Sequence, residues 1–240
     1  SDGTYLYIVD LNNHRIQKFT LAGVFVSKIG TQGAENDQFN CPYCIKYSNS
    51  KLYIADKNNN RIKIHNASDL AWVDNVPVAA APYGCWVDET NNYLIVRTGT
   101  DIYVYNLADK SLVRSKTGQA TGYGVALLGD YVYISDLNNN KISKYLYSDL
   151  SFVASYSPGT GSLPGQLTKP YHLNVWPERN LILVANSASP YYIVGITPDL
   201  KFQSNPDGYI EIGKLNAAEK KNFARHVVTQ FSSKQDDKSL

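Results

Sequence analysis

The feature that most constrains the fold of this chain is a repeated stretch in which an apolar strand, an Asn-rich turn and a basic residue follow one another. The stretch reads YLYIVDLNNHRIQKF from Tyr5, KLYIADKNNNRIKIH from Lys51 and YVYISDLNNNKISKY from Tyr131. Looser copies read YLIVRTGTDIYVY from Tyr93 and LILVANSASPYYIVGI from Leu181. Such repetition along one chain predicts an array of similar structural units.

The spacing of the copies indicates which unit is repeated. The first strands of the copies end at Asp10, Asp56, Thr98, Asp136 and Asn186, so successive copies are 46, 42, 38 and 50 residues apart. This period is typical of one four-stranded blade of a β-propeller. The strands alternate Tyr with aliphatic residues and carry few charges, as expected for strands that neighbouring blades cover on both faces.

Each clear copy also pairs an acidic residue with a basic residue across an Asn-rich turn. The pairs are Asp10 with Arg15, Asp56 with Arg61, and Asp136 with Lys141. Asn tolerates the positive φ that a tight turn requires. Because the pairs recur at the blade period, we expect them to satisfy backbone groups at the turns and not to carry out catalysis.

A second pattern precedes three of the copies. It reads GTQGAENDQFNCPYC from Gly30, APYGC from Ala81 and GTGSLPGQLTKPYHL from Gly159. Joined to the strand and turn pattern, it resembles the NHL repeat family over roughly residues 2 to 203. The resemblance implies an all-β protein, a β-propeller of four-stranded blades.

Two blade numbers agree with the repeat. Five repeats are visible, and the first begins at its second strand. Five blades result if a C-terminal segment such as GYIEIG from Gly208 supplies the missing strand. Six blades, the commoner number in NHL propellers, result if the chain is N-terminally incomplete.

The character of the sequence changes near its end. We assign residues 1–213 to the NHL-like propeller and residues 214–240 to a C-terminal helix and a disordered tail. Asn216 and Glu219 form a capping box, which predicts that a short helix begins there and runs from about 217 to 231. The polar ending SSKQDDKSL predicts disorder.

Four tyrosines precede the predicted innermost strand of a blade: Tyr43, Tyr83, Tyr123 and Tyr171. Equivalent positions in a propeller surround its axis, so we expect these tyrosines, with His172, to line one mouth of the central channel. Aromatic rings with polar tips suit a sugar, a base, a proline or a cation. The sequence therefore leaves two interpretations open, a ligand-binding site at the channel mouth or aromatic packing between blades.

The cysteines and histidines give weaker signals. Cys41-Pro42-Tyr43-Cys44 has the letters of a glutaredoxin motif, but redox chemistry needs a helix after the first Cys, and the following residues read as strands. We expect either a disulfide between Cys41 and Cys44 or buried thiols. Some NHL-like lyases bind a metal through histidines at such positions, yet here His172 alone fits, whereas catalytic zinc needs three ligands. We expect no catalytic residue, no metal and no cofactor.

These observations favour a non-catalytic interaction scaffold that binds a protein, or a carbohydrate, through its propeller faces. The alternatives are a small-ligand binder at the channel mouth or a metal-dependent lyase- or hydrolase-like propeller enzyme, and an RNA-binding NHL domain. A net charge of +2 disfavours a nucleic-acid partner. No apolar run is long enough to span a membrane. A glycosylation sequon, Asn66-Ala67-Ser68, favours a secreted protein.

Overall fold

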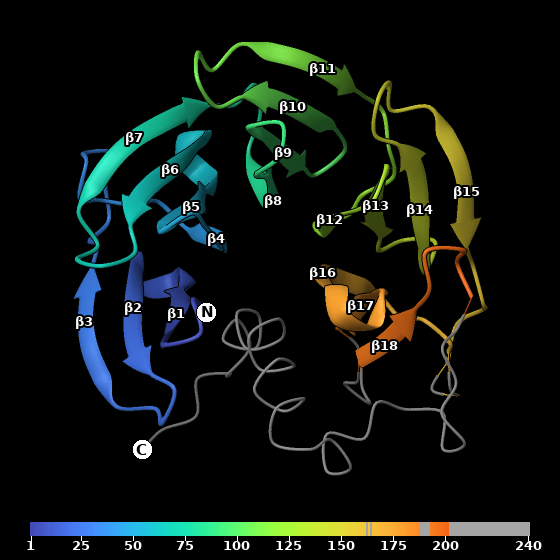
Figure 1. The fold of residues 1–240 in the computed structure, drawn as a ribbon, viewed down its shortest axis with the longest axis horizontal. Helices are drawn as coiled ribbons and strands as arrows, with labels where there is room; N and C mark the ends of the chain where they lie inside the picture. Colours follow the sequence, from blue (N-terminus) through green and yellow to red (C-terminus); the bar gives the residue numbers. More distant parts are fainter. Residues whose placement is uncertain (162, 164, 188–192, 202–240) are drawn as a thin grey trace. The chain divides into compact units, whose positions relative to one another are not determined.

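The fold is all-β and consists of antiparallel sheets that follow one another along the chain (Figure 1). The computed structural model describes residues 1–161, 163, 165–187 and 193–201. Within these residues the strands form five sheets, which are the blades of a β-propeller. The predicted fold class is confirmed. The described residues are divided between two compact units, residues 1–82 and residues 83–201.

The first unit holds blades 1 and 2. Blade 1 begins with the strand that is second in the other repeats, as the sequence predicted. Its strands are β1 (Tyr5–Asp10), β2 (Arg15–Thr20) and β3 (Phe25–Ile29). The strands of blade 2 are β4 (Pro42–Ser48), β5 (Lys51–Asp56), β6 (Arg61–Asn66) and β7 (Trp72–Pro77).

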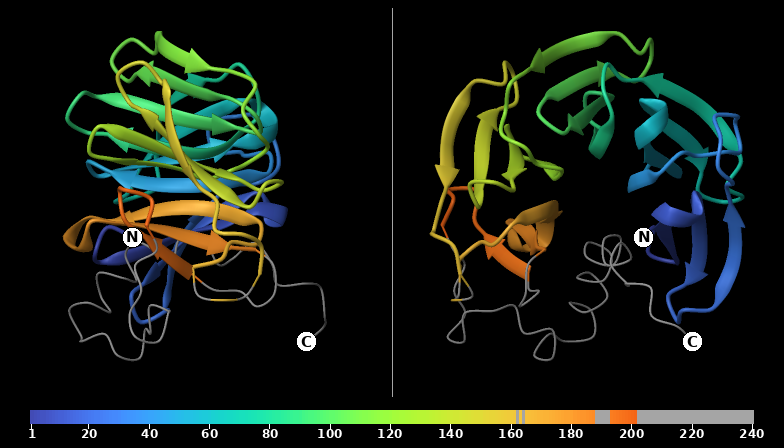
Figure 2. Two further views of the ribbon diagram at one scale, coloured as in Figure 1. Left: turned by 90° about the vertical axis from the view of Figure 1, so that its right-hand side faces the viewer. Right: turned by 180° about the vertical axis from the view of Figure 1, so that it is seen from behind.

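The second unit holds blades 3 to 5, whose strands lie side by side in chain order (Figure 2). Blade 3 consists of β8 (Pro82–Asp88), β9 (Tyr93–Thr98), β10 (Ile102–Asn106) and β11 (Leu112–Lys116). Blade 4 consists of β12 (Val125–Leu128), β13 (Tyr131–Asp136), β14 (Lys141–Leu146) and β15 (Phe152–Tyr156). The described strands of blade 5 are β16 (Pro170–Trp176), β17 (Leu181–Asn186) and β18 (Ile193–Ile196).

The repeated turns form as the sequence predicted. In blades 1 and 2 a short 3-10 turn, η1 (Leu11–Asn13) or η2 (Lys57–Asn59), follows the aspartate. The turns end in left-handed residues, with φ of 54° at His14, 50° at Asn60 and 51° at Asn140.

The acidic and basic residues of each turn also pair as predicted. The closest N–O distances are 2.7 Å for Arg15–Asp10, 2.8 Å for Arg61–Asp56 and 3.7 Å for Lys141–Asp136. In each case the two residues are cross-strand partners in the sheet. The pairs therefore stabilise the turns, in agreement with a structural role.

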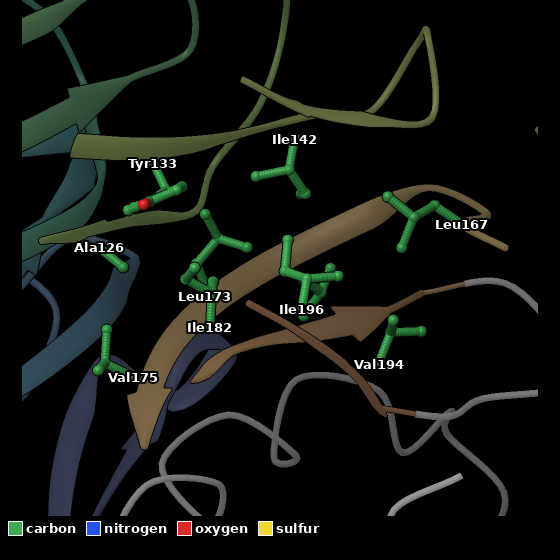
Figure 3. Packing of buried hydrophobic residues seen from close by; sticks show 10 residues of the cluster. Ala126, Tyr133, Ile142, Leu167, Leu173, Val175, Ile182, Val194 and Ile196 are labelled. Atoms are coloured by element: carbon green, nitrogen blue, oxygen red, sulfur yellow. The ribbon is translucent and has the colours of Figure 1, made fainter. Parts of the chain in front are cut away.

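Burial follows the position of a strand in its blade. The second strands β5, β9 and β13 are buried at five of six positions, whereas the last strands β3, β11 and β15 are largely exposed. Blades 4 and 5 share an apolar core, with Tyr133 and Ile142 facing Leu173, Ile182 and Ile196 (Figure 3). Each fully buried aliphatic side chain contributes about 1.5–3 kcal/mol, so this packing holds the two sheets together.

Some predictions concern residues outside the described part of the chain. The helix over 217–231, the polar tail and the strand from Gly208 all lie there, and with them the assignment of residues 214–240 to a separate segment. In the part of the chain that the structure describes, no helix is long and apolar enough to cross a membrane.

Candidate functional site

The linkers between blades determine where the predicted tyrosines lie. In two linkers a glutamine folds the loop back on itself, since Gln38 Oε1 accepts the Glu35 N–H at 3.2 Å and Gln166 Oε1 accepts the Leu163 N–H at 3.1 Å. The next residue, Phe39 or Leu167, is 0 % exposed and anchors the loop in the core.

The end of each of these linkers is fixed to the neighbouring turn. The Asn40 N–H donates to Asp56 Oδ1 at 2.7 Å, and the Thr168 N–H donates to Asn186 Oδ1 at 3.0 Å. The Pro-Tyr pair that follows therefore begins its strand at a fixed place.

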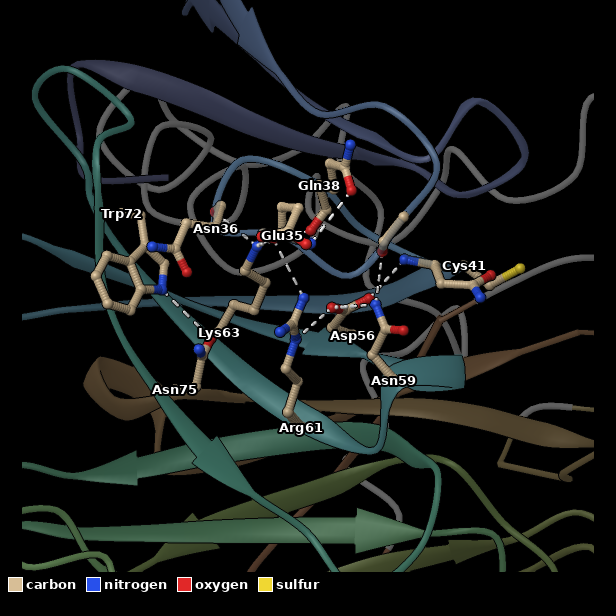
Figure 4. A network of polar contacts seen from close by, with 12 residues as sticks. Glu35, Asn36, Gln38, Cys41, Asp56, Asn59, Arg61, Lys63, Trp72 and Asn75 are labelled. Carbon is tan, nitrogen blue, oxygen red and sulfur yellow. Dashed lines mark hydrogen bonds and ion pairs between the residues drawn. The ribbon is translucent and has the colours of Figure 1, made fainter.

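Lys63 adds a second anchor for the linker between blades 1 and 2 (Figure 4). Its buried ammonium donates to the carbonyl oxygens of Glu35, Asn36 and Gln38 at 2.8, 2.7 and 2.7 Å. The Phe39 ring centroid lies 4.5 Å away. Burial lowers the pKa of Lys63 to about 8, and the nearby Arg61 charge adds to this effect. Sequence reasoning missed this residue, because a lysine within a strand normally indicates an exposed face.

Three of the four predicted tyrosines come into contact in the second unit. The Tyr83 and Tyr123 rings are stacked, with centroids 4.4 Å apart and an interplanar angle of 22°. Tyr171 meets Tyr123 edge-on, at 4.9 Å and 71°. The His172 ring lies 5.2 Å from the Tyr171 ring. We call Tyr83, Tyr123 and Tyr171 the tyrosine stack.

Tyr43 occupies the equivalent position in the first unit. It is the second residue of β4, as Tyr83 is of β8 and Tyr171 is of β16. Its ring is half-buried, and the Lys57 ammonium lies 5.8 Å from the ring centroid. A ring of all four tyrosines around a channel stays a prediction.

Glycines next to the stack allow its blades to approach closely. A Cβ atom on Gly84 would lie 2.3 Å from the Tyr123 carbonyl oxygen. A Cβ atom on Gly124 would lie 2.7 Å from the Leu173 backbone nitrogen. Backbone contacts this short are open only to glycine, so these two residues set the spacing at which the tyrosine rings meet. The sequence contained the signal, a Tyr-Gly dipeptide in two copies, but its purpose depends on contacts between blades.

Ser135 connects the stack across blades 4 and 5. Its hydroxyl accepts the N–H groups of Gly124 at 2.9 Å and Tyr123 at 3.3 Å, and donates to the Tyr171 carbonyl oxygen at 3.1 Å. Ala55 and Ala185 hold the same position in β5 and β17. A polar residue in an otherwise apolar strand was the available signal, and the sequence analysis did not use it.

The stack is electrically neutral at physiological pH. Burial raises the pKa of Tyr171, and both burial and the neighbouring Tyr83 raise the pKa of Tyr123. His172 is 7 % exposed, and burial lowers its pKa to about 4. A neutral aromatic surface suits apolar and hydrogen-bonding partners better than phosphates.

No disulfide joins Cys41 to Cys44 among the described residues. The choice between a disulfide and buried thiols stays a prediction. Cys41 lies in the linker, where it has a φ of 54° and its N–H donates to His14 Nδ1 at 3.0 Å. Cys44 is buried within β4, so the motif is followed by a strand and not by a helix.

The described ranges contain no group of three or more His, Cys, Asp or Glu side chains that could hold a metal ion.

The sequon lies at the hairpin between β6 and β7. Asn66 is the last residue of β6, and Ser68 is exposed. Lys18 of blade 1 donates to the carbonyl oxygens of Ala67 at 2.9 Å and Ser68 at 2.7 Å. The hairpin is therefore held in place, and glycosylation at Asn66 stays a prediction.

Comparison with known proteins identifies the fold and nothing finer. No protein-family model and no curated protein matches the chain. A chain in the crystal structure of the mitotic checkpoint complex is similar, with a TM-score of 0.60 and 12 % identity, over 85 % of this chain and 61 % of that one. Hydrazine synthase from Kuenenia stuttgartiensis is similar with a TM-score of 0.57 and 15 % identity, over 68 % of this chain and 48 % of that one.

The fold is a β-propeller. The present chain spans about half to three-fifths of the length of these two chains. At such identities the likeness concerns the fold alone.

Proposed function

We propose that this chain is a non-catalytic interaction module and that a protein partner docks on the tyrosine stack. The observation that carries the proposal is the direct contact between three half-buried tyrosine rings from three successive blades. Tyrosine is among the residues that dominate the binding energy of protein interfaces. A surface of this composition therefore suits a partner with apolar and hydrogen-bonding groups.

The arrangement also favours binding because the rings are ordered in advance. Each aromatic pair is worth about 0.5–1.5 kcal/mol beyond its buried area. Ser135 fixes the backbone of two of the tyrosines, Tyr123 and Tyr171. A partner then loses less free energy to ordering side chains than it would on flexible residues.

The geometry favours a protein partner over a carbohydrate. Sugars bind to open aromatic faces, but Tyr83 and Tyr123 cover one face of each other at 22°. Tyr171 places its ring edge-on to Tyr123. The surface thus offers ring edges and polar tips more than flat open faces. The experiment described below also tests whether the protein binds carbohydrates.

The electrostatics disfavour acid–base catalysis by His172. A general acid or base works best with a pKa near the operating pH, whereas burial lowers the pKa of His172 to about 4. The metal-dependent alternative is not affected by this argument, because a neutral imidazole is the form that binds a metal.

We further propose that the repeats are of the NHL type and that the protein is secreted. The first proposal is supported by the linker, strand and turn pattern, in which Gln38, Gln166 and the turn aspartates make repeated hydrogen bonds. The second is supported by the Asn66 sequon. A net charge of +2 gives little support to RNA binding.

The proposal is tested with peptides selected for binding to the protein from a displayed random library. Their affinities are then measured for the wild type, Tyr123→Ala and Tyr171→Ala by fluorescence polarisation. Tyr131→Ala is the matched control, because Tyr131 pairs with Leu128, at the end of β12 away from Tyr123.

We expect the two stack variants to bind the peptides at least tenfold more weakly than the wild type, a loss of about 1.4 kcal/mol of binding free energy. The control should bind as the wild type does. Equal affinity in all four proteins would show that the stack is not the docking surface. Binding of simple glycans in place of peptides, lost in the same variants, would favour the carbohydrate alternative.

A further inference from the structure

A cavity lies beside blade 4, between strands β13 to β15 and the linker from blade 3. Its volume is about 290 Å³. Lys116 and Lys141 contribute cationic side chains to its wall, and Ile134, Tyr145 and Phe152 contribute apolar surface. The cavity shares no residue with the tyrosine stack, so a ligand bound in it would be independent of the proposed function.

The cavity exists because blade 4 lacks two side chains that fill the equivalent space in blade 2. Phe39 stands four residues before Tyr43 and is buried, whereas Gln119 stands four residues before Tyr123. Lys63 is the third residue of β6 and fills the space under its linker, whereas the third residue of β14 is the short Ser143. Gln119 and Ser143 are thus smaller than the side chains that stand at the equivalent positions of blade 2.

A buried cation lies behind the wall of this cavity, next to a residue that lines it. Arg97 is the fifth residue of β9, where β5 has Ala55 and β13 has Ser135, and it is 0 % exposed. Its Nη2 donates to the carbonyl oxygen of Ala120, which lines the cavity. The Nε and Nη1 atoms have no hydrogen-bond partner among the residues that the structure describes.

The guanidinium remains charged under physiological conditions. Burial lowers the pKa of Arg97 to about 10, while Tyr145, Asp101 and Asp136 act in the opposite direction. An uncompensated buried charge is costly, so such a group is expected to meet an anion.

The nearby carboxylate of Asp136 is engaged elsewhere. Its oxygens accept the backbone and side-chain N–H groups of Asn139 at 3.0 and 2.8 Å, and Lys141 lies 3.7 Å away. Among the described residues no carboxylate accepts a hydrogen bond from Nε or Nη1 of Arg97, so the charge of this guanidinium is left to attract an anion in the adjacent cavity.

We propose that the cavity binds a small organic carboxylate, with its charge against Lys116 and attracted by Arg97 behind the wall, and its apolar body against Ile134, Tyr145 and Phe152. The volume lies at the lower end of small-molecule sites, which span roughly 300–1,000 Å³. A molecule of about one aromatic ring fits this space, and a nucleotide does not. The aromatic wall selects against inorganic anions, which have no apolar body.

The test uses benzoate as the probe and neutral benzamide as its isosteric control, with binding measured by isothermal titration calorimetry. We expect benzoate to bind the wild type at least tenfold more tightly than benzamide does. Arg97→Met should weaken benzoate binding at least tenfold, and Lys116→Gln several-fold. Lys28→Gln, on the exposed last strand of blade 1, should leave it unchanged.

Three results would overturn the proposal: no benzoate binding at millimolar concentration, equal binding of benzoate and benzamide, or undiminished binding by Arg97→Met. Inorganic phosphate binding as tightly as benzoate would also contradict it, because the apolar wall would then contribute nothing. If Arg97→Met fails to fold, Ser143→Leu carries the test. It fills the cavity from a different strand and should abolish benzoate binding, and retained binding would refute the proposal.

Discussion

The glycines beside the tyrosine stack allow a sharp test of how the stack is built. We predict that Gly84→Ala destabilises the protein, because its new methyl group would lie 2.3 Å from the Tyr123 carbonyl oxygen. A backbone atom cannot rotate away as a side chain can, so the two blades must separate. Overpacking of this kind costs about 1–3 kcal/mol, and weakening the Tyr83–Tyr123 pair adds up to about 1 kcal/mol.

We therefore expect the free energy of unfolding to fall by about 1–4 kcal/mol in Gly84→Ala. Gly124→Ala should behave alike, since its methyl group would lie 2.7 Å from the Leu173 nitrogen. Urea titration followed by circular dichroism gives the free energies. The near-ultraviolet signal of the tyrosines should also decrease, because the rings would lose their fixed contact.

Gly99→Ala is the matched control for this experiment. Its methyl group would meet only Tyr83 Cε2, at 3.8 Å, which is an ordinary van der Waals distance. We expect its stability to stay within about 0.5 kcal/mol of the wild type. The reasoning is refuted if Gly84→Ala is as stable as the wild type, or if Gly99→Ala loses as much stability as Gly84→Ala.

Two further predictions concern buried cations and histidines. Lys63→Met should lower the free energy of unfolding by about 2–4 kcal/mol in urea titration, because three carbonyl oxygens lose their donor. Lys28→Met should leave the free energy of unfolding unchanged. Equal losses in the two variants would contradict the anchoring role of Lys63. Burial holds the pKa values of His65 and His172 at about 4, below the ordinary 6.5, so the unfolded chain binds protons first as pH falls. The free energy of unfolding should therefore fall as the pH is lowered from about 6.5 to 4, by up to about 3 kcal/mol for each histidine. If the double variant His65→Gln/His172→Gln loses stability over this pH range as the wild type does, the prediction is contradicted.

The parts of the fold that the sequence predicted are those encoded within one repeat. Asp56, the Asn-rich turn and Arg61 lie within six residues of one another, so their pairing follows from the local pattern alone. The same holds for the left-handed Asn60 and for the burial of β5 on both faces. Repetition then extends each local prediction to the other blades.

The parts that the sequence did not predict depend on contacts between repeats. Equivalent positions identified the tyrosines, but only the blade spacing set by Gly84 and Gly124 decides which rings touch. Arg97 and the cavity arise where one copy departs from the pattern. The sequence left a disulfide or buried thiols open at Cys41 and Cys44, because spacing in sequence does not give the left-handed backbone conformation at Cys41.

The most direct test of the account is photo-cross-linking from within the tyrosine stack. The photoreactive residue p-benzoylphenylalanine replaces Tyr171 in one preparation and Tyr131 in another, and each protein is irradiated in an extract of its own source. The account predicts that the Tyr171 position forms an adduct with one defined protein, identified by mass spectrometry, and that the Tyr131 position does not. No protein adduct from the Tyr171 position, or the same adducts from both positions, would contradict the claim that the stack is the docking surface.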